Sequence, residues 1–286
     1  MIASLGVFDG VHIGHQRILS TLKDLSGKFG LPPVVYVISH PPEYSSPDFP
    51  GLLMPLEKRK EMISSFAHPV VIDFSSVRDL SAEDFVERFL KDVKIVVVGR
   101  DFKFGRGGYG DAKILEAKGK TVVSVEDVLV DGVRVSSSLV RRLVQTGRVE
   151  EAQRYLGRPF ELFGKVYRDR QYGRVLGFPT ANLDRGSERL VNLKSGVYFV
   201  RVTLPSGEGK FGVMNVGYRP TVLETRDVKY EVYVLEFEGD LYGKELKVEV
   251  LRYLREERKF GSVEELKEAI SRDVETAKEI SKDFLI

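Results

Sequence analysis

The sequence predicts an α/β domain built on a doubly wound parallel sheet, followed by a small antiparallel β-barrel domain with a terminal helix. Three observations lead to this expectation. The chain has 286 residues, which is more than a single hydrophobic core usually serves. Its first half alternates apolar runs with stretches of helical period, whereas its second half has short alternating runs separated by glycine, proline and aspartate. The pattern of apolar residues changes near residue 157, so we expect domains at residues 1–157 and 158–286.

Apolar runs in the first half are strand-like and do not alternate with polar residues, which is typical of parallel strands covered on both faces. Amphipathic stretches separate them, and this alternation indicates a doubly wound sheet. Ser81, with Asp84 three residues on, suits the start of one helix. A further helix is expected from Ser137 to about residue 156, with a break at Gly147. The expected strands are residues 3–8, 34–38, 70–74, 95–98 and 121–125, and the expected helices are residues 14–28, 56–66, 82–90 and 111–117.

The second half, from residue 160 to about 250, reads as antiparallel β-structure with turns rich in glycine and aspartate. We expect the sheet to close into a barrel, because closure removes exposed edges. The chain then enters one long helix, opened by Ser262 with Glu265 three residues later, which is a capping-box pattern.

Composition excludes several classes of function. The formal net charge is only +2, from 44 basic and 42 acidic side chains, which gives no drive toward nucleic acid or membrane. There is no cysteine, so disulfides, thiolate metal sites and a cysteine nucleophile are excluded. No apolar run approaches membrane-spanning length, and the N-terminus lacks a signal-peptide pattern. We expect a soluble, cytoplasmic protein with no nucleic-acid, membrane or obligatory protein partner.

A histidine pair, His12 and His15, follows the first expected strand on a glycine-bearing turn that leads into a helix. Free N–H groups at a helix start attract phosphate, and glycine lets phosphate approach closely. Two imidazoles there can donate hydrogen bonds to oxygens that gain charge as a phosphoryl centre is attacked. A metal pair and incidental surface histidines are the alternatives. The expected phosphate-binding residues of this turn are Gly6, Phe8, Gly10 and Gly14.

Residues 6–15, Gly-x-Phe-Asp-Gly-x-His-x-Gly-His, resemble the signature of FAD synthetases, a branch of the nucleotidyltransferase superfamily. The resemblance implies direct transfer of an adenylyl group from ATP to FMN, with pyrophosphate leaving and no covalent intermediate. It makes His12 and His15 catalytic.

Two further stretches are similar to motifs of that family. Residues 135–141 resemble its second nucleotide motif, in which Ser137 and Ser138 would hold phosphate and Arg141 would neutralise pyrophosphate charge. Three serines before a helix also form a good cap. Residues 99–105 resemble a loop near the nucleotide and flavin, with Asp101, Phe102 and Phe104 as flavin-binding candidates. These aromatic rings either stack on a flat ligand or anchor the loop.

One departure from the family pattern concerns metal binding. The family has Phe-(Asp/Glu)-Pro-His-Pro after its second strand, and here Ser39 stands where the carboxylate is expected. This puts the metal affinity or rate of the adenylyl transfer in doubt. His40 does not fall at the family's histidine position, so no role is assigned to it.

A compact loop at residues 173–182 is the main motif of the second half. Thr180 and Asn182 offer neutral oxygens two residues apart, on one side of an extended segment, which suits Mg²⁺ held together with nucleotide phosphates. A simple β-turn is the alternative. Gly173 and Gly177 allow close backbone approach and are expected to bind ATP.

This loop resembles the riboflavin kinase signature Gly-Phe-Pro-Thr-Ala-Asn, and residues 196–198, 212–221, 240–243 and 254–260 resemble further motifs in family order. With the N-terminal motifs, the resemblance covers nearly the whole chain and is to bifunctional riboflavin kinase/FAD synthetases of prokaryotic type. It implies Glu231 as the base that takes the ribityl hydroxyl proton and Arg255 as a flavin contact.

The resemblance implies riboflavin, FMN and ATP as substrates, Mg²⁺ as cofactor, and FMN and FAD as products. One alternative keeps the kinase but gives the first domain an impaired activity or another phosphorylated acceptor, because of Ser39. Another is a regulatory protein that binds flavin or nucleotide together with nucleic acid, against which the balanced charge argues.

Overall fold

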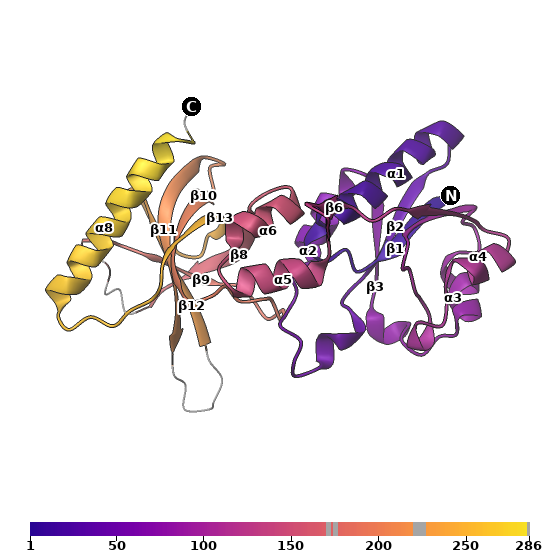
Figure 1. Cartoon of the computed structure of the whole chain (residues 1–286), viewed down its shortest axis with the longest axis horizontal. Helices are drawn as coiled ribbons and strands as arrows, with labels where there is room; N and C mark the ends of the chain where they lie inside the picture. Colours follow the sequence, from indigo (N-terminus) through magenta and orange to yellow (C-terminus); the bar gives the residue numbers. More distant parts are fainter. Residues whose placement is uncertain (170–172, 174–176, 220–226, 285–286) are drawn as a thin grey trace. The chain divides into compact units, whose positions relative to one another are not determined.

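The computed structural model describes residues 1–169, 173, 177–219 and 227–284. The chain divides into two compact units (Figure 1). The first contains Met1–Val140 and Tyr155–Gly157, and the second contains Arg141–Arg154 and Arg158–Ile286. The division falls inside helix α5 (Ser137–Gln145). Each unit has its own sheet and its own core.

The N-terminal unit is built on a parallel sheet with the order β3-β2-β1-β4-β5. This confirms the predicted doubly wound sheet, and the predicted helices of the α/β half are present between its strands. The strands are β1 (Ile2–Gly6), β2 (Pro33–Ile38), β3 (His68–Ile72), β4 (Ile95–Gly99) and β5 (Thr121–Val125), and the helices are α1 (Ile13–Phe29), α2 (Leu56–Ser64), α3 (Ala82–Phe89) and α4 (Ala112–Ala117).

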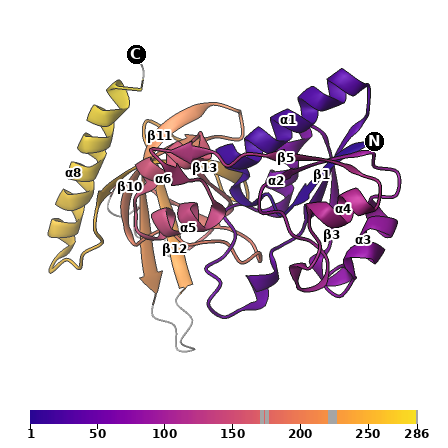
Figure 2. The ribbon, with the colours of Figure 1, turned by 45° about the vertical axis from the view of Figure 1, so that its right-hand side comes forward.

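Both faces of this sheet are covered, as its apolar strands require. Ile2 joins a core with Leu19 of α1 and Ile63 of α2. The next residue of β1, Ala3, joins a second core with Phe85 of α3 and Leu115 of α4. Successive side chains of a strand point to opposite faces, so α1 and α2 cover one face and α3 and α4 the other (Figure 2).

Helix ends follow the predicted caps. The Ser81 hydroxyl accepts a hydrogen bond from Asp84 N at 3.0 Å, which confirms the start of α3. The predicted break at Gly147, where φ is 78°, separates α5 from α6 (Val149–Leu156). A hairpin of β6 (Leu129–Val130) and β7 (Val133–Arg134) was not predicted. The Asp-Gly dipeptide at its turn is the sequence signal for such a hairpin.

The C-terminal unit is a closed antiparallel barrel with the strand order β10-β11-β12-β9-β8-β13, as predicted. Helix α8 (Val263–Lys282) lies along its outside beside β10 and β11 (Figures 1 and 2). Phe199 of β10 packs with Val274 and Ala277 of α8, and Ser262 caps the helix by accepting from Glu265 N at 3.1 Å. The strands are β8 (Phe160–Tyr167), β9 (Ala181–Asp184), β10 (Gly196–Thr203), β11 (Gly209–Arg219), β12 (Asp227–Val234) and β13 (Glu245–Arg255).

Among the helices of the described residues, none is both long and apolar enough to cross a membrane.

Candidate active sites

The first site begins where β1 ends, in the middle of the parallel sheet. The chain order of the strands reverses between β1 and β4, since β1 pairs with β2 on one side and with β4 on the other. Open α/β sheets bind ligands at the carboxyl ends of strands at such a point. The turn that follows β1 therefore lies where a ligand is expected.

This turn has a backbone that side chains of L residues rarely adopt. Phe8 has a φ of 51° and Val11 a φ of 40°. Gly10 has a φ of 74°, and a Cβ there would lie 2.7 Å from the Leu53 side chain, so the position requires glycine. Non-glycine residues held in this region usually mark a functional site whose surroundings fix the strain.

Hydrogen bonds from three directions fix the turn. The buried Asp9 carboxylate accepts from Leu53 N at 2.9 and 3.1 Å. The Asp9 carbonyl accepts from the Ser137 hydroxyl at 2.9 Å, and the Val11 carbonyl accepts from Gln16 Nε2 at 2.9 Å. Ser137, one of the predicted phosphate-binding residues, is thereby joined to the histidine turn although it lies far along the chain.

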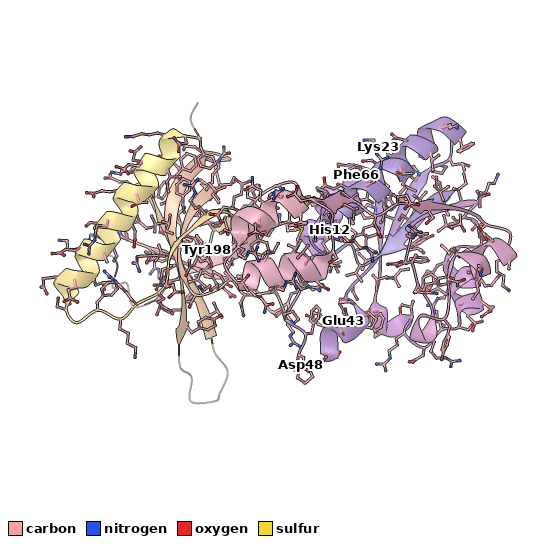
Figure 3. The ribbon with its side chains drawn as sticks, viewed as in Figure 1. His12, Lys23, Glu43, Asp48, Phe66 and Tyr198 are labelled. Carbon is pink, nitrogen blue, oxygen red and sulfur yellow. The ribbon has the colours of Figure 1, made fainter. Side chains whose placement is uncertain are left out.

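His12 and His15 form one stacked pair. Their rings lie 3.6 Å apart between centroids, with an angle of 14° between the planes. His12 caps α1, and its Nδ1 accepts from His15 N at 3.2 Å, so the proton of its neutral ring is on Nε2. His12 is 6% exposed and is labelled in Figure 3. The predicted helix start and the histidine pair thus coincide.

His15 is held in its uncharged form. Burial, then the neighbouring His12 and then Arg59, lower the pKa of His15 well below its usual value. Its Nδ1 is shielded from solvent and has no hydrogen-bond partner among the described residues. Phe8 packs edge-on against its ring at a centroid distance of 5.2 Å. A neutral imidazole carries one donor and one acceptor nitrogen, so His15 remains a hydrogen-bonding group without a charge.

A cavity of about 270 Å³ opens beside the pair. Three of its polar lining groups, Glu126, Asp127 and Arg134, were not predicted. Arg134 binds Asp101 at 2.5 Å and Asp127 at 3.0 Å, so it ties the loop after β4 to the segment after β5. The sequence signal that could have identified Arg134 is its position directly before the motif at residues 135–141. The cavity is also lined by His12, Gly14, His15, Ile18, Gly99, Val125, Val128, Val135, Ser136 and Ser137.

The other predicted residues of this site have different surroundings. Phe104 is buried in the core against Phe85, at a centroid distance of 5.5 Å, and Phe102 stacks on it at 5.5 Å. Ser138 is the second residue of α5, after Ser137, and Arg141, on the same helix, is 6% exposed. Both lie outside the set of residues that lines the cavity. Their contacts with nucleotide and flavin stay predictions, as do those of Asp101.

Ser39, at the position where the family pattern has a carboxylate, is engaged in local structure. Its hydroxyl accepts from Phe74 N at 3.0 Å, and its N–H donates to Ile72 O at 2.9 Å. It therefore joins the end of β2 to the end of β3. Within the described residues it does not belong to the cavity lining.

The second site lies in the barrel unit, where Glu231 of β12 is directly opposite two asparagines. Glu231 pairs with Asn182 of β9 on one side and with Asn215 of β11 on the other. Residues directly opposite each other in antiparallel strands place their side chains on the same face. These three side chains line one cavity of about 330 Å³.

Asn182 and Thr180 lie between this cavity and a second one of about 260 Å³. Asn182 is 7% exposed, and its Oδ1 is buried without a hydrogen-bond partner among the described residues. A buried oxygen of this kind is costly unless a ligand satisfies it. Gly173 lies in the lining as well, and its carbonyl accepts from Phe178 N at 2.8 Å. Residues 174–176 and 220–221 of the predicted motifs lie outside the described residues.

Charged groups surround Glu231. Lys229 forms an ion pair with Asp169 and lies 3.7 Å from the Glu231 carboxylate. Burial, and then Glu231 itself, raise the pKa of Glu257. The predicted base therefore lies near one cation and near a second carboxylate.

Arg255 lines the same cavity but is held by helix α8. Its guanidinium donates to the Asp273 carboxylate at 2.8 and 2.7 Å and lies 5.9 Å from the centre of the Phe260 ring. This two-point ion pair fixes the end of β13 to α8. A direct contact of Arg255 with flavin stays a prediction.

Comparisons with known proteins match each half of the chain to a protein family. A family model described as FAD synthetase matches residues 1–139, and one described as riboflavin kinase matches residues 156–281. A relative from Pseudomonas fluorescens, named bifunctional riboflavin kinase/FMN adenylyltransferase, is 37% identical over 98% of this chain and 93% of its own length. A relative of the same name from Bacillus subtilis is 34% identical over 96% of this chain and 91% of its own length.

A solved structure supports the same architecture. A crystal structure from Streptococcus pneumoniae, described as a macrolide-efflux protein, aligns with a TM-score of 0.87 at 28% identity and covers 97% of this chain and 93% of its own. The description names a function of that protein only. The structural alignment covers residues of both units of this chain. Two family models in order and full-length relatives above 30% identity place the chain in the family of bifunctional riboflavin kinase/FMN adenylyltransferases.

Proposed function

We propose that this bifunctional enzyme makes FAD in two steps, with one step in each domain. The C-terminal domain, residues 158–286, transfers the γ-phosphoryl group of ATP to riboflavin and yields FMN and ADP. The N-terminal domain, residues 1–157, transfers the adenylyl group of a second ATP to FMN and yields FAD and pyrophosphate. The product of the first step is the substrate of the second.

The observation that carries the kinase assignment is the pairing of Glu231 with Asn182 on adjacent strands. A carboxylate beside a buried amide oxygen that has no hydrogen-bond partner in the described part of the chain combines a proton acceptor with a group that needs a ligand. In the proposed step, the riboflavin 5′-hydroxyl oxygen attacks the γ-phosphorus, Glu231 takes the hydroxyl proton, and ADP leaves. The Lys229 ammonium group lies 3.7 Å from the Glu231 carboxylate.

Mg²⁺ fits the side-chain oxygens of Thr180 and Asn182, because both are neutral oxygen ligands of the kind that hard cations accept. In addition, Asn182 Oδ1 lacks a hydrogen-bond partner among the described residues. Bound there, the ion would neutralise charge on the nucleotide phosphates. The remaining coordination is expected from those phosphates and from water.

In the N-terminal domain an FMN phosphate oxygen attacks the α-phosphorus of ATP, and the bond to pyrophosphate breaks. This step requires no proton transfer, so the histidines serve as hydrogen-bond donors rather than as bases. His12 has its proton on Nε2 because its Nδ1 is occupied. A lowered pKa keeps His15 neutral. Both rings can then donate to oxygens that gain charge in the transition state, with Ser137 and the start of α1 beside them.

An impaired transferase is not favoured despite Ser39, because the FAD synthetase family model matches residues 1–139 and relatives named as bifunctional enzymes match nearly the whole chain. We place the enzyme in the cytoplasm, where riboflavin, FMN and ATP are its small-molecule partners. The absence of cysteine fits a reducing compartment.

A single time course tests the proposal. The purified protein is incubated with riboflavin, ATP and Mg²⁺, and the flavins are separated by chromatography. FMN that appears first and then gives way to FAD supports both steps and their order. FMN that accumulates without FAD contradicts the N-terminal assignment and directs attention to Ser39. No conversion of riboflavin or of added FMN overturns both assignments.

A further inference from the structure

Arg59, on helix α2, is the largest fully buried side chain among the described residues, with an exposed fraction of 0%. It belongs to no motif identified in the sequence. A buried guanidinium is costly unless its N–H groups are satisfied. A wholly buried arginine in a small α/β domain therefore needs a structural or functional reason.

The guanidinium donates to three backbone carbonyls. Its Nη1 donates to Val7 O at 2.7 Å and to Ile38 O at 3.3 Å, and its Nη2 donates to Ser39 O at 2.5 Å. Val7 lies just beyond the carboxyl end of β1, which ends at Gly6, and Ile38 and Ser39 lie at and just beyond the end of β2, which ends at Ile38. One side chain thus joins two adjacent strand ends on the catalytic edge of the sheet.

Val7 is the residue at which the strained turn begins. The next residue, Phe8, already has a positive φ of 51°. Ser137 and Gln16 hold the later carbonyls of the turn, at Asp9 and Val11. The bond from Arg59 to Val7 fixes the entry to the turn, so that the histidines start from a defined position.

Arg59 also places a permanent positive charge near the imidazole pair. It is one of the groups that lower the pKa of His15, after burial and His12. Guanidinium groups stay charged at all relevant pH values. The substrates bring several negative phosphate oxygens to this point, which a fixed cation under the turn favours.

We propose that Arg59 is a positioning residue for adenylyl transfer, which holds the Val7 carbonyl at the entry to the histidine turn and supplies a fixed positive charge there. The inference rests on the proposed function of the N-terminal domain. Lysine cannot replace it fully, because a single ammonium group lacks the planar fork that reaches both strand ends.

Other charged groups face the pair and must stay constant in the test. Asp9 lies in the turn itself, and Glu126, Asp127 and Arg134 line the adjoining cavity. None of these is altered by changing Arg59, so a shift in the titration of His15 reports on the arginine charge.

The test compares Arg59→Met, which removes charge and hydrogen bonds, with Arg59→Lys, which keeps the charge. Lys60→Met is the matched control, because Lys60 is a more exposed cation on the same helix, paired with Glu57 at 2.7 Å. The full-length proteins are assayed for FAD formation from FMN across pH. The His15 ring is titrated by NMR, and kinase activity of the same preparations provides an internal standard.

We expect Arg59→Met to lower the rate of FAD formation about 100-fold, the cost of a small misplacement of catalytic groups. The pKa of His15 should rise in Arg59→Met and stay unchanged in Arg59→Lys. FAD formation by Arg59→Lys should fall about 10-fold, because the orienting bonds are partly lost. Lys60→Met should match the wild type in each measurement, and kinase activity should be equal in all four proteins.

A wild-type rate of FAD formation in Arg59→Lys would overturn the positioning role of Arg59. If Arg59→Met does not fold, Arg59→Lys alone tests this role. An unchanged His15 titration in a folded Arg59→Met protein would overturn the role of the charge. A wild-type enzyme that makes FMN but no FAD would instead contradict the proposed function, and the NMR titration would still decide whether Arg59 acts on His15.

Discussion

Replacing Glu231 by glutamine removes the proposed base of the kinase and keeps the size of the side chain. The structure allows the effect on stability to be separated from the effect on catalysis. The Glu231 side chain is 33% exposed and, among the described residues, its ion-pair partner is Lys229 at 3.7 Å. A partly exposed pair of this kind contributes at most about 1 kcal/mol. Lys229 keeps its partner Asp169 in the variant, so unfolding should change little.

The effect on the reaction should be much larger. A positioned general base contributes about 10²–10⁴-fold to the rate, which corresponds to roughly 3–5 kcal/mol of activation free energy. We therefore expect Glu231→Gln to lower FMN formation by about 10²–10⁴-fold. Adenylylation of supplied FMN should be unchanged, because Glu231 belongs to the C-terminal unit and the histidine pair to the other.

The assay measures FMN formed from riboflavin and, separately, FAD formed from supplied FMN, both by chromatography. Glu249→Gln is the matched control. Glu249 lies on another strand of the same barrel, pairs with Lys247 at 3.0 Å and does not belong to the cavity lining among the described residues. Loss of both activities in Glu231→Gln, or of neither, refutes the assignment of the base. An equal loss in Glu249→Gln would show that the barrel, rather than the base, had been damaged.

Three further predictions concern the other groups of the two sites. His15→Asn should lower FAD formation about 10²–10³-fold, the usual cost of one transition-state hydrogen-bond donor, while FMN formation by the same protein stays at the wild-type level. The lowered pKa of His15 means that the unfolded chain binds more protons than the native one below about pH 6.5. The N-terminal unit should therefore lose stability as pH falls from 7 to 5. Thermal unfolding should show that this decrease in stability is smaller in His15→Asn than in the wild type. Asn182→Ala should raise the Mg²⁺ concentration needed for half-maximal kinase activity without changing FAD formation from FMN, and an unchanged Mg²⁺ dependence would contradict the metal assignment.

The secondary structure could be predicted closely where local chemistry decides it. The apolar runs of the first half became the strands of the parallel sheet because burial on both faces requires them. Ser81 and Ser262 begin helices because their hydroxyls accept from backbone N–H groups three residues on. The short β6–β7 hairpin was missed, although its Asp131-Gly132 turn is visible in the sequence.

Parts of the two sites could also be predicted, because their residues stand close together along the chain. His12 and His15 are neighbours on one helix start, and Thr180 and Asn182 lie two residues apart. Glu231 was found only through family order, since a glutamate on a half-exposed strand has no signal of its own. Its pairing with Asn182 required the register of β12 and β9.

The sequence by itself determined the class of each domain, the glycine-bearing turn with its two histidines and the family, because these depend on periodicity and on short motifs. Only the tertiary structure showed that Arg59 donates a hydrogen bond to the Val7 carbonyl at the entry to the turn. It also showed that Arg134 binds Asp101, 33 residues away in the chain, and that Asp273 binds Arg255. These contacts depend on which strand and helix ends meet in space. A buried cation or an ion pair is recognisable only once its partners, distant in the chain, have been brought within hydrogen-bonding distance.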